Sequence, residues 1–382
     1  PSGADAAVVF FEKSSCEDVE LRHFCLHSIN DALKSQWNTW QQNRKDLLKR
    51  KIFSFASSHL NDILVGPKVI RETISSLLAE LAKREWPQLW PSFCNDILGL
   101  INTNYTEAYV GIRALHLLAQ DACSSEFNTC MPTKRRNQVL QGINKHLPVI
   151  IKSLYIVLNQ QYSIFNSDRS AKKAEILIVC ALECLGVFVE WMQIDSCFEP
   201  GCNLLEVFSV LIKDSSHPIR MASAKAMTGL CNRKAFTDAS KITASEAVML
   251  VMRTCAALPL DAQFPVDEDL YKFQQQIAKL ICCIGEIHLQ CFQPSDPVVV
   301  LCVEISSRMF QHPSYKITER MLGTWYYILE RLNGFITAKC VADRIPWLIS
   351  LYGQKVLRHG SPEDPIETPV SQYGIFDFDD ND

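Results

Sequence analysis

The sequence predicts an all-α protein in which antiparallel helix pairs stack into a solenoid. Apolar residues recur at helical spacing along most of the chain, and no segment shows the period-two alternation of a β-strand. Glycine is scarce, with 14 of 382 residues, about half the usual ~7%, which disfavours Gly-rich nucleotide loops and tightly turned β architectures. Hydrophobic residues make up 48% and charged residues 21%, so the composition is that of a folded protein rather than a disordered one.

Helices follow one another with short turns between them. The clearest is predicted over 67–84, where Ile70, Ile74 and Leu77 begin an apolar stripe along one side. Similar spacing extends this assignment in both directions. In chain order, the predicted helices span 17–37, 43–58, 67–84, 88–102, 104–122, 136–159, 171–192, 203–213, 217–231, 243–258, 267–292, 296–311, 315–333 and 336–358.

The repeat length identifies the type of solenoid. One helix pair per about 40–47 residues is the spacing of HEAT-type repeats. Segment 214–226 has the residues of such a repeat: Asp214 in the turn, Pro218 at the start of the second helix, and then Arg220 followed by small alanines. Small side chains let a neighbouring helix pack closely, and the Asp and Arg can bond between adjacent repeats. We therefore predict a HEAT-repeat α-solenoid, a right-handed superhelix of antiparallel helix pairs.

The predicted repeats form one long region without domain breaks. Each helix pair in a solenoid buries its apolar face on the next pair, so a long chain needs no separate cores. We expect HEAT-type repeats over 17–360, a partly ordered N-terminal remnant over 1–16, and an acidic, Pro-containing loop or tail over 361–382. The first residue is Pro1 rather than Met, from which we expect a portion of a longer protein.

Charge and cysteine content limit the partners and the compartment. The chain has 38 Lys and Arg against 42 Asp and Glu, a net charge of −4, so nucleic acid would have to bind a local basic patch. The 16 cysteines are scattered through apolar helical patterns, where a free thiol behaves as a small hydrophobe. We therefore expect a reducing compartment, the cytosol or the nucleus. No apolar run reaches the length of a membrane span, so we expect no membrane insertion.

No arrangement of residues in the sequence predicts catalysis. Phosphate-binding glycine loops, the G-x-S-x-G turn and the H-E-x-x-H zinc motif are all missing from the sequence. The pairs Cys123 with Cys130 and Cys197 with Cys202 lack a second ligand pair at zinc spacing. We expect no enzymatic activity, no metal site and no cofactor.

A corner rich in Trp and Pro lies between two predicted helices. Trp86, Pro87, Trp90 and Pro91 close one helix and open the next. Each proline lacks an N–H and fixes its own φ, so it ends the preceding helix and suits the first turn of the following one. We expect the two indole rings to pack the corner between repeats, which is a structural role.

This corner resembles the Glu-Trp-Pro-x-x-Trp-Pro segment of the exportins, nuclear transport receptors of the karyopherin-β (importin-β) family. Two further stretches resemble one RNA-carrying branch of that family: the helix that begins Arg22-His23-Phe24 and runs to Trp37, and the acidic stretch 373–380 with its Phe-Asp-Phe-Asp sequence. The resemblance is collinear, spans nearly the whole chain and covers the N-terminal third or so of a full exportin. Leu89 stands where that branch has His.

The resemblance implies a transport receptor rather than a catalyst. It implies that the protein binds Ran in its GTP state together with a short double-stranded RNA that has a 3′ overhang, such as precursor microRNA. GTP would be bound and hydrolysed by Ran, and the receptor would shuttle between nucleus and cytoplasm. FG-repeat proteins of the nuclear pore are further implied partners. Two alternatives stay open, an exportin for protein cargo with leucine-rich signals and a HEAT scaffold that does not depend on Ran.

Candidate binding residues follow from the helices that the resemblance places on the inner face. These are the predicted helices 17–37, 67–84, 104–122, 171–192, 217–231, 267–292 and 315–333. A row of cations there could follow the phosphates of A-form RNA, which is recognised by shape and by its 2′-hydroxyls. We predict Arg113, Lys225 and Lys279 as phosphate contacts, and Asp31, Glu72 and Glu80 as contacts to Ran.

Two basic runs could also act as nuclear-localisation or nucleic-acid patches. The run over 44–51 alternates with an apolar stripe on a predicted outer helix, so a solvated helix face is the better interpretation. The run Lys134-Arg135-Arg136 precedes a predicted helix and is the better candidate of the two.

Overall fold

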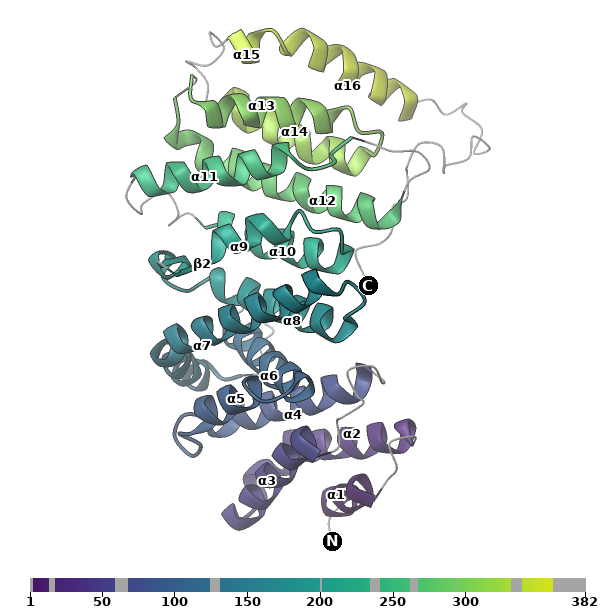
Figure 1. Cartoon of the computed structure of the whole chain (residues 1–382), viewed down its shortest axis with the longest axis vertical. Coiled ribbons are helices and arrows are strands. Elements are labelled where there is room, and N and C mark those ends of the chain that lie inside the picture. The colour runs from purple at the N-terminus through teal and green to yellow at the C-terminus, as the bar shows by residue number, and fades with distance from the viewer. Residues whose placement is uncertain are drawn as a thin grey trace. The chain divides into compact units, whose positions relative to one another are not determined.

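A computed structural model describes residues 3–13, 18–58, 68–123, 131–199, 201–233, 241–261, 267–293, 295–330 and 339–359. Helices dominate this part of the chain, and its one sheet is a hairpin of two short strands. The chain divides into two compact units, Pro1–Met192 and Gln193–Asp382, which are described separately below (Figure 1). The prediction of an all-α protein is confirmed.

Unit 1 is built from four helix pairs that stack in sequence order. The first members of the pairs are α1 (Gly3–Lys13), α3 (Gln42–Ser58), α5 (Phe93–Ile101) and α7 (Thr133–Ser167). The second members are α2 (Val19–Gln36), α4 (Lys68–Glu85), α6 (Tyr105–Cys123) and α8 (Lys172–Val189), and a 3₁₀ turn η1 (Trp37–Thr39) follows α2. The second members pack on one another in a row, α2 on α4, α4 on α6 and α6 on α8. This is the stacking of a HEAT-repeat solenoid, and the prediction of that fold is confirmed.

Unit 2 repeats the arrangement. Its helices are α9 (Leu204–Leu211), α10 (His217–Cys231), α11 (Lys241–Ala256), α12 (Glu268–Cys283), α13 (Pro297–Phe310), α14 (Tyr315–Glu330), α15 (Lys339–Ala342) and α16 (Ile345–His359). Its smaller elements are the 3₁₀ turns η2 (Ile194–Cys197) and η5 (Leu289–Cys291), the π-helical turn η4 (Ile284–His288), and strands β1 (Phe198–Glu199) and β2 (Cys202–Asn203). Helices α10, α12 and α14 pack in one row, and α9, α11 and α13 pack in the other.

Local chemistry explains where these helices start. The side chains of Asn203, Ser216 and Asp267 each accept a hydrogen bond from a backbone N–H in the first turn of α9, α10 and α12. Pro218 lies at the first turn of α10, where its missing N–H costs no hydrogen bond. The apolar stripe that predicted the helix over 67–84 is buried along α4, with Ile74, Leu77 and Leu78 at 0% exposure.

Several boundaries differ from the prediction. Helix α5 begins at Phe93 rather than 88, because the Trp-Pro corner continues as turns until Ser92. Helix α7 runs on to Ser167 and contains Pro148, whereas the prediction ended at 159. The predicted helix over 267–292 loses its regular hydrogen bonding after Cys283, and the one over 336–358 is divided into α15 and α16. The β1–β2 hairpin was missed, since two-residue strands are too short to show a period.

The described residues 3–13 form α1, within the segment that was predicted to be a partly ordered remnant. The tail over 361–382 lies outside the described residues. No described helix combines the length and the hydropathy that crossing a membrane requires.

Candidate partner-binding surface

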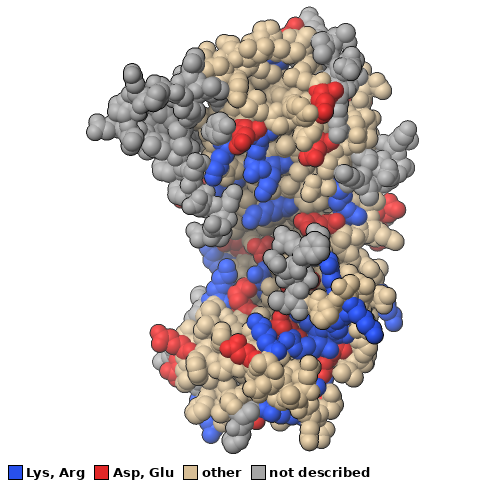
Figure 2. Space-filling view, turned by 180° about the vertical axis from the view of Figure 1, so that it is seen from behind, with Lys and Arg blue, Asp and Glu red and all other residues tan. Residues whose placement is uncertain are grey.

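The residues predicted to bind partners lie on the helices of the two rows α2–α4–α6–α8 and α10–α12–α14. On the face seen in Figure 2, Lys and Arg side chains gather, and Asp and Glu side chains lie among them. A site for a charged partner therefore depends on which charges already bind one another and which do not.

Arg113 and Glu72, predicted to contact RNA and Ran respectively, form an ion pair between α6 and α4. Arg113 Nε lies 2.8 Å from Glu72 Oε2, and its guanidinium also reaches Glu183 of α8 at 3.4 Å. The Tyr109 hydroxyl donates a hydrogen bond to the other Glu72 oxygen. Burial opposes ionisation of Glu72, but the hydrogen bonds from Tyr109 and Arg113 outweigh it and lower the pKa of the carboxyl. A phosphate that contacted Arg113 would have to compete with these carboxylates.

Glu80 is also held within unit 1. Its carboxylate lies 2.6 Å from Lys83 Nζ and 2.5 Å from Arg84 Nη1, and Lys83 forms a second ion pair with Asp121 of α6. Burial raises the pKa of Glu80, but the hydrogen bonds and charges of Lys83 and Arg84 have the larger combined effect and lower it. This group ties α4 to α6.

Asp31 is the exposed member of the three predicted acids. It pairs with His27 one turn earlier on α2 at 3.1 Å, and the Asp31 side chain is 62% exposed. A partner can reach this carboxylate without breaking a buried ion pair. Binding through Asp31 therefore costs less energy than binding through Glu72 or Glu80.

Lys225 and Lys279 differ from Arg113. Lys225 lies on α10 and Lys279 on α12, both are exposed, and neither ammonium has a hydrogen-bond or ion-pair partner among the described residues. The two helices are tied on this side by a hydrogen bond of 2.8 Å from Gln276 Nε2 to Thr228 Oγ1. Arg220, which the repeat signature places in a structural role, stacks over the Phe273 ring at 4.9 Å.

The Trp-Pro corner forms part of the core of unit 1. Trp86 is 1% exposed and packs against Phe93, with 5.4 Å between ring centroids. Helix α7 passes close to it at Gly142, where a Cβ would lie 2.8 Å from the Trp86 ring. Trp90 is 7% exposed, and its indole N–H donates to Asp96 Oδ2 at 2.8 Å. Pro91 follows at the exposed surface of the corner.

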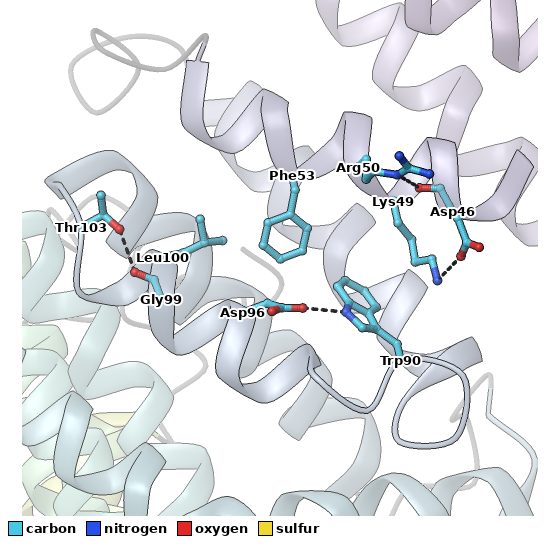
Figure 3. Close-up of a pocket in the computed structure, with 9 residues that line it drawn as sticks. All are labelled: Asp46, Lys49, Arg50, Phe53, Trp90, Asp96, Gly99, Leu100 and Thr103. Carbon is cyan, nitrogen blue, oxygen red and sulfur yellow. Dashed lines mark hydrogen bonds and ion pairs between the residues drawn. The ribbon is translucent and has the colours of Figure 1, made fainter. Parts of the chain in front are cut away.

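A pocket of about 650 Å³ opens beside this corner, between α3 and α5. Its apolar lining comes from Phe53, Trp90 and Leu100, with the rings of Phe53 and Trp90 edge to face at 5.6 Å (Figure 3). Charged side chains of both signs also line it: Lys49 and Arg50, with Asp46 beside them, and Asp96, which bonds the Trp90 indole. The pocket therefore combines an aromatic floor with a polar rim of low net charge.

Several side chains of the two basic runs bond within unit 1. In the first run, Lys49 pairs with Asp46 and Glu85, and Lys51 pairs with Glu12 of α1 at 2.5 Å. In the second run, Arg135 donates to the carbonyl oxygens that end α4, and Arg136 Nε donates to the Ala122 carbonyl near the end of α6 at 2.7 Å. Sequence reasoning missed this capping role, because the acceptors are main-chain atoms about fifty and fourteen residues away.

The described residues include no candidate metal centre, and burial makes several of their thiols unreactive. No cluster of three or more His, Cys, Asp or Glu that could hold a metal is found among the described residues. The described cysteines are free, and burial raises the pKa of Cys94 to about 11 and that of Cys302 to about 12. Such thiols stay protonated near neutral pH and are poor nucleophiles.

Comparison with known proteins gives one consistent result. Residues 67–227 match the family described as Exportin 1-like protein. The chain is 22% identical to Exportin-5 of Dictyostelium discoideum over 371 residues, covering 94% of this chain and 32% of that protein. It is 23% identical to human Exportin-5 over 94% of this chain and 30% of that protein, and 19% identical to Exportin-T of Danio rerio over 72% and 27%. The chain thus spans about a third of the length of the curated relatives that it matches most fully.

Proposed function

We propose that this chain, which is similar in sequence to exportins over nearly all of its length, is part of a nuclear export receptor that binds Ran-GTP together with structured double-stranded RNA. The receptor would shuttle between nucleus and cytoplasm. It would catalyse no reaction, since the nucleotide and its hydrolysis belong to Ran. Similarity to Exportin-5 and to the Exportin 1-like family supports the receptor role.

The observation that carries the RNA part of the proposal is the pair of unpartnered lysines in unit 2. Lys225 and Lys279 project from adjacent helices of one row, with no carboxylate bound to either among the described residues. Packed helices lie about 8–10 Å apart, so the two ammonium groups can reach phosphates along one groove of an A-form duplex. Contacts of this kind recognise duplex shape and charge rather than sequence.

For Ran, the exposed carboxylate of Asp31 is the best-placed of the predicted contacts. Glu72 and Glu80 would bind Ran only by sharing the cations that already hold them. We therefore propose Asp31 as a direct contact, and Glu72 and Glu80 as acids that shape the charge of the surface around it.

The test is RNA binding by the full-length protein with Ran-GTP, with Ran-GDP and without Ran, at two salt concentrations. The probe is a short RNA hairpin with a 3′ overhang. We expect binding that Ran-GTP strengthens, and a Lys225→Gln/Lys279→Gln variant that binds more weakly with a salt slope smaller by about 2, since each phosphate contact contributes about one unit. The matched control is Lys13→Gln/Arg253→Gln, which alters two exposed cations on α1 and α11.

Each of the other outcomes selects an alternative. Binding of Ran-GTP without any coupling to RNA would point to an exportin for protein cargo with leucine-rich signals. Binding that is indifferent to the nucleotide on Ran would leave a HEAT scaffold that does not depend on Ran. An unchanged salt slope in the double variant would show that Lys225 and Lys279 do not contact the RNA phosphates.

The pocket beside the Trp-Pro corner supports a second class of partner, the FG repeats of nuclear pore proteins. A phenylalanine ring of such a repeat can enter the pocket and pack against the exposed sides of the Phe53 and Trp90 rings, because aromatic pairs favour edge-to-face contacts. The low net charge of the rim suits a repeat that is itself uncharged. This pocket is the one we propose for FG-repeat binding.

Filling the pocket should weaken that binding. Gly99 lies on the pocket wall in α5, and a Cβ there would meet no atom within 4 Å, so Gly99→Leu can be accommodated by the fold. We expect the variant to bind a synthetic Phe-Gly repeat peptide about tenfold more weakly, as measured by fluorescence anisotropy. Gly353→Leu, at a second open position on α16, is the matched control. Equal affinities of the two variants and the parent protein would show that FG repeats do not bind in this pocket.

A further inference from the structure

Helix α7 differs in charge from the rest of the chain. Its 35 residues include five Lys and Arg and no Asp or Glu, although the chain as a whole carries a net charge of −4. Two of the five, Arg135 and Arg136, donate to main-chain carbonyls inside unit 1. The other three, Lys134, Lys145 and Lys152, are exposed and have no hydrogen-bond or ion-pair partner among the described residues.

Two of these lysines share a stripe with exposed apolar side chains. Val149 is 54% exposed and Ile156 is 41% exposed, while the buried residues of α7 lie on its opposite side. Lys145, Val149, Lys152 and Ile156 follow one another at steps of four, three and four residues, so they lie on one face of the helix. We call these four residues the α7 stripe.

The α7 stripe repeats every seven residues, with Lys145 followed by Lys152 and Val149 followed by Ile156. Each repeat covers about 10 Å of helix axis. Helices that pair lengthwise repeat every seven residues, usually with two apolar positions in each seven. The α7 stripe supplies one apolar residue and one lysine in each seven. The chemistry of the stripe thus specifies its complement, a helix with apolar residues at heptad spacing and acidic residues beside them.

We propose that the α7 stripe is a docking surface for an acidic amphipathic helix of a partner protein. Charge complementarity supports this proposal. Helix α7 has no carboxylate to pair with Lys145 or Lys152, so acidic residues of the partner can pair with both lysines. The apolar residues argue for a protein partner rather than a nucleic acid, since a phosphate backbone gains nothing from Val149 and Ile156. A helix with apolar anchors at heptad spacing buries both of them.

The test uses the full-length protein and a synthetic peptide of four heptads, with Leu at two positions and Glu at the flanking positions of each heptad. Binding is measured by fluorescence anisotropy at two salt concentrations. We expect about tenfold weaker binding by Lys145→Glu/Lys152→Glu, with loss of salt dependence, and about tenfold weaker binding by Val149→Gln/Ile156→Gln. Both pairs are exposed on the helix, so circular dichroism should show an unchanged helical content.

Two controls separate this site from other charged surfaces. Lys34→Glu/Arg253→Glu makes the same change in net charge on other helices and should bind the peptide like the parent protein. A peptide of the same composition with its Leu residues scrambled should bind at least about tenfold more weakly.

The contrary results are equally specific. Peptide binding that is absent, or that the α7 variants leave unchanged, overturns the proposal. Binding of a duplex RNA or of anionic vesicles that depends on the two lysines but not on Val149 and Ile156 would make the stripe a general polyanion site and overturn it as well. RNA binding with Ran-GTP, measured on the same preparations, should not change, so the outcome is independent of the function proposed above.

Discussion

Replacing Lys49 by Met is expected to destabilise unit 1 by about 3 kcal/mol, because it removes the cation from a buried carboxylate. Lys49 Nζ lies 2.5 Å from Glu85 Oε2, the Glu85 side chain is 0% exposed, and that of Lys49 is 13% exposed. Glu85 ends α4 at the start of the Trp-Pro corner, so this pair links α3 to the corner. The loss should appear in urea titrations and as faster hydrogen exchange in α4 and α5.

A second variant separates the buried charge from the lost packing. Lys49→Met/Glu85→Met removes both charges and should recover most of the loss, since replacing a buried pair by apolar residues is close to neutral. A double variant as unstable as the single one would show that packing of the lysine stem, rather than charge, holds α3 to the corner.

The fold could be predicted because its signals are local. The stripe that begins at Ile70, Ile74 and Leu77 lies within one helix. The repeat signature from Asp214 to Arg220 lies within one turn and the start of the helix that follows it. Errors arose where tertiary contacts prevail over local pattern. Helix α7 continues to Ser167 through Pro148, and the predicted helix beyond Cys283 changes to π and 3₁₀ geometry where Gly285 approaches Thr324 of α14.

The candidate site could be predicted only in part, because the charge state of a surface depends on contacts between helices. Spacing was enough to place Lys225 and Lys279 on exposed faces. It could not show that Glu72 pairs with Arg113, forty-one residues further on, or that Lys83 pairs with Asp121. Both pairs join neighbouring helices of the row, so knowing them requires the register of one helix against the next.

The difference between Arg135 and its neighbour Lys134 gives the second large expected effect. Arg135 donates to the carbonyl of Lys83 at 2.6 Å and to that of Ala82 at 3.2 Å, and it also reaches the Trp86 carbonyl. These acceptors lie where α4 ends, and a guanidinium can serve several of them at once, although the Ala82 carbonyl also accepts the Trp86 N–H at 3.0 Å. Arg135→Met should therefore cost about 3 kcal/mol of stability, since bonds from a charged donor are worth about 1.5–3 kcal/mol each and are not fully additive.

Lys134→Met is the matched control, because Lys134 is exposed and has no partner among the described residues. Its effect should stay within about 0.5 kcal/mol. Arg135→Lys should remain destabilised, since an ammonium lacks the planar fork that spans several carbonyls.

The same variants also decide between the two interpretations of this basic run. If the run is a nuclear-localisation signal, nuclear import should be lost with Lys134→Met and with Arg135→Met and kept with Arg135→Lys. If Arg135 is a helix-capping residue, both Arg135 variants should lower the stability of the protein and Lys134→Met should leave it unchanged.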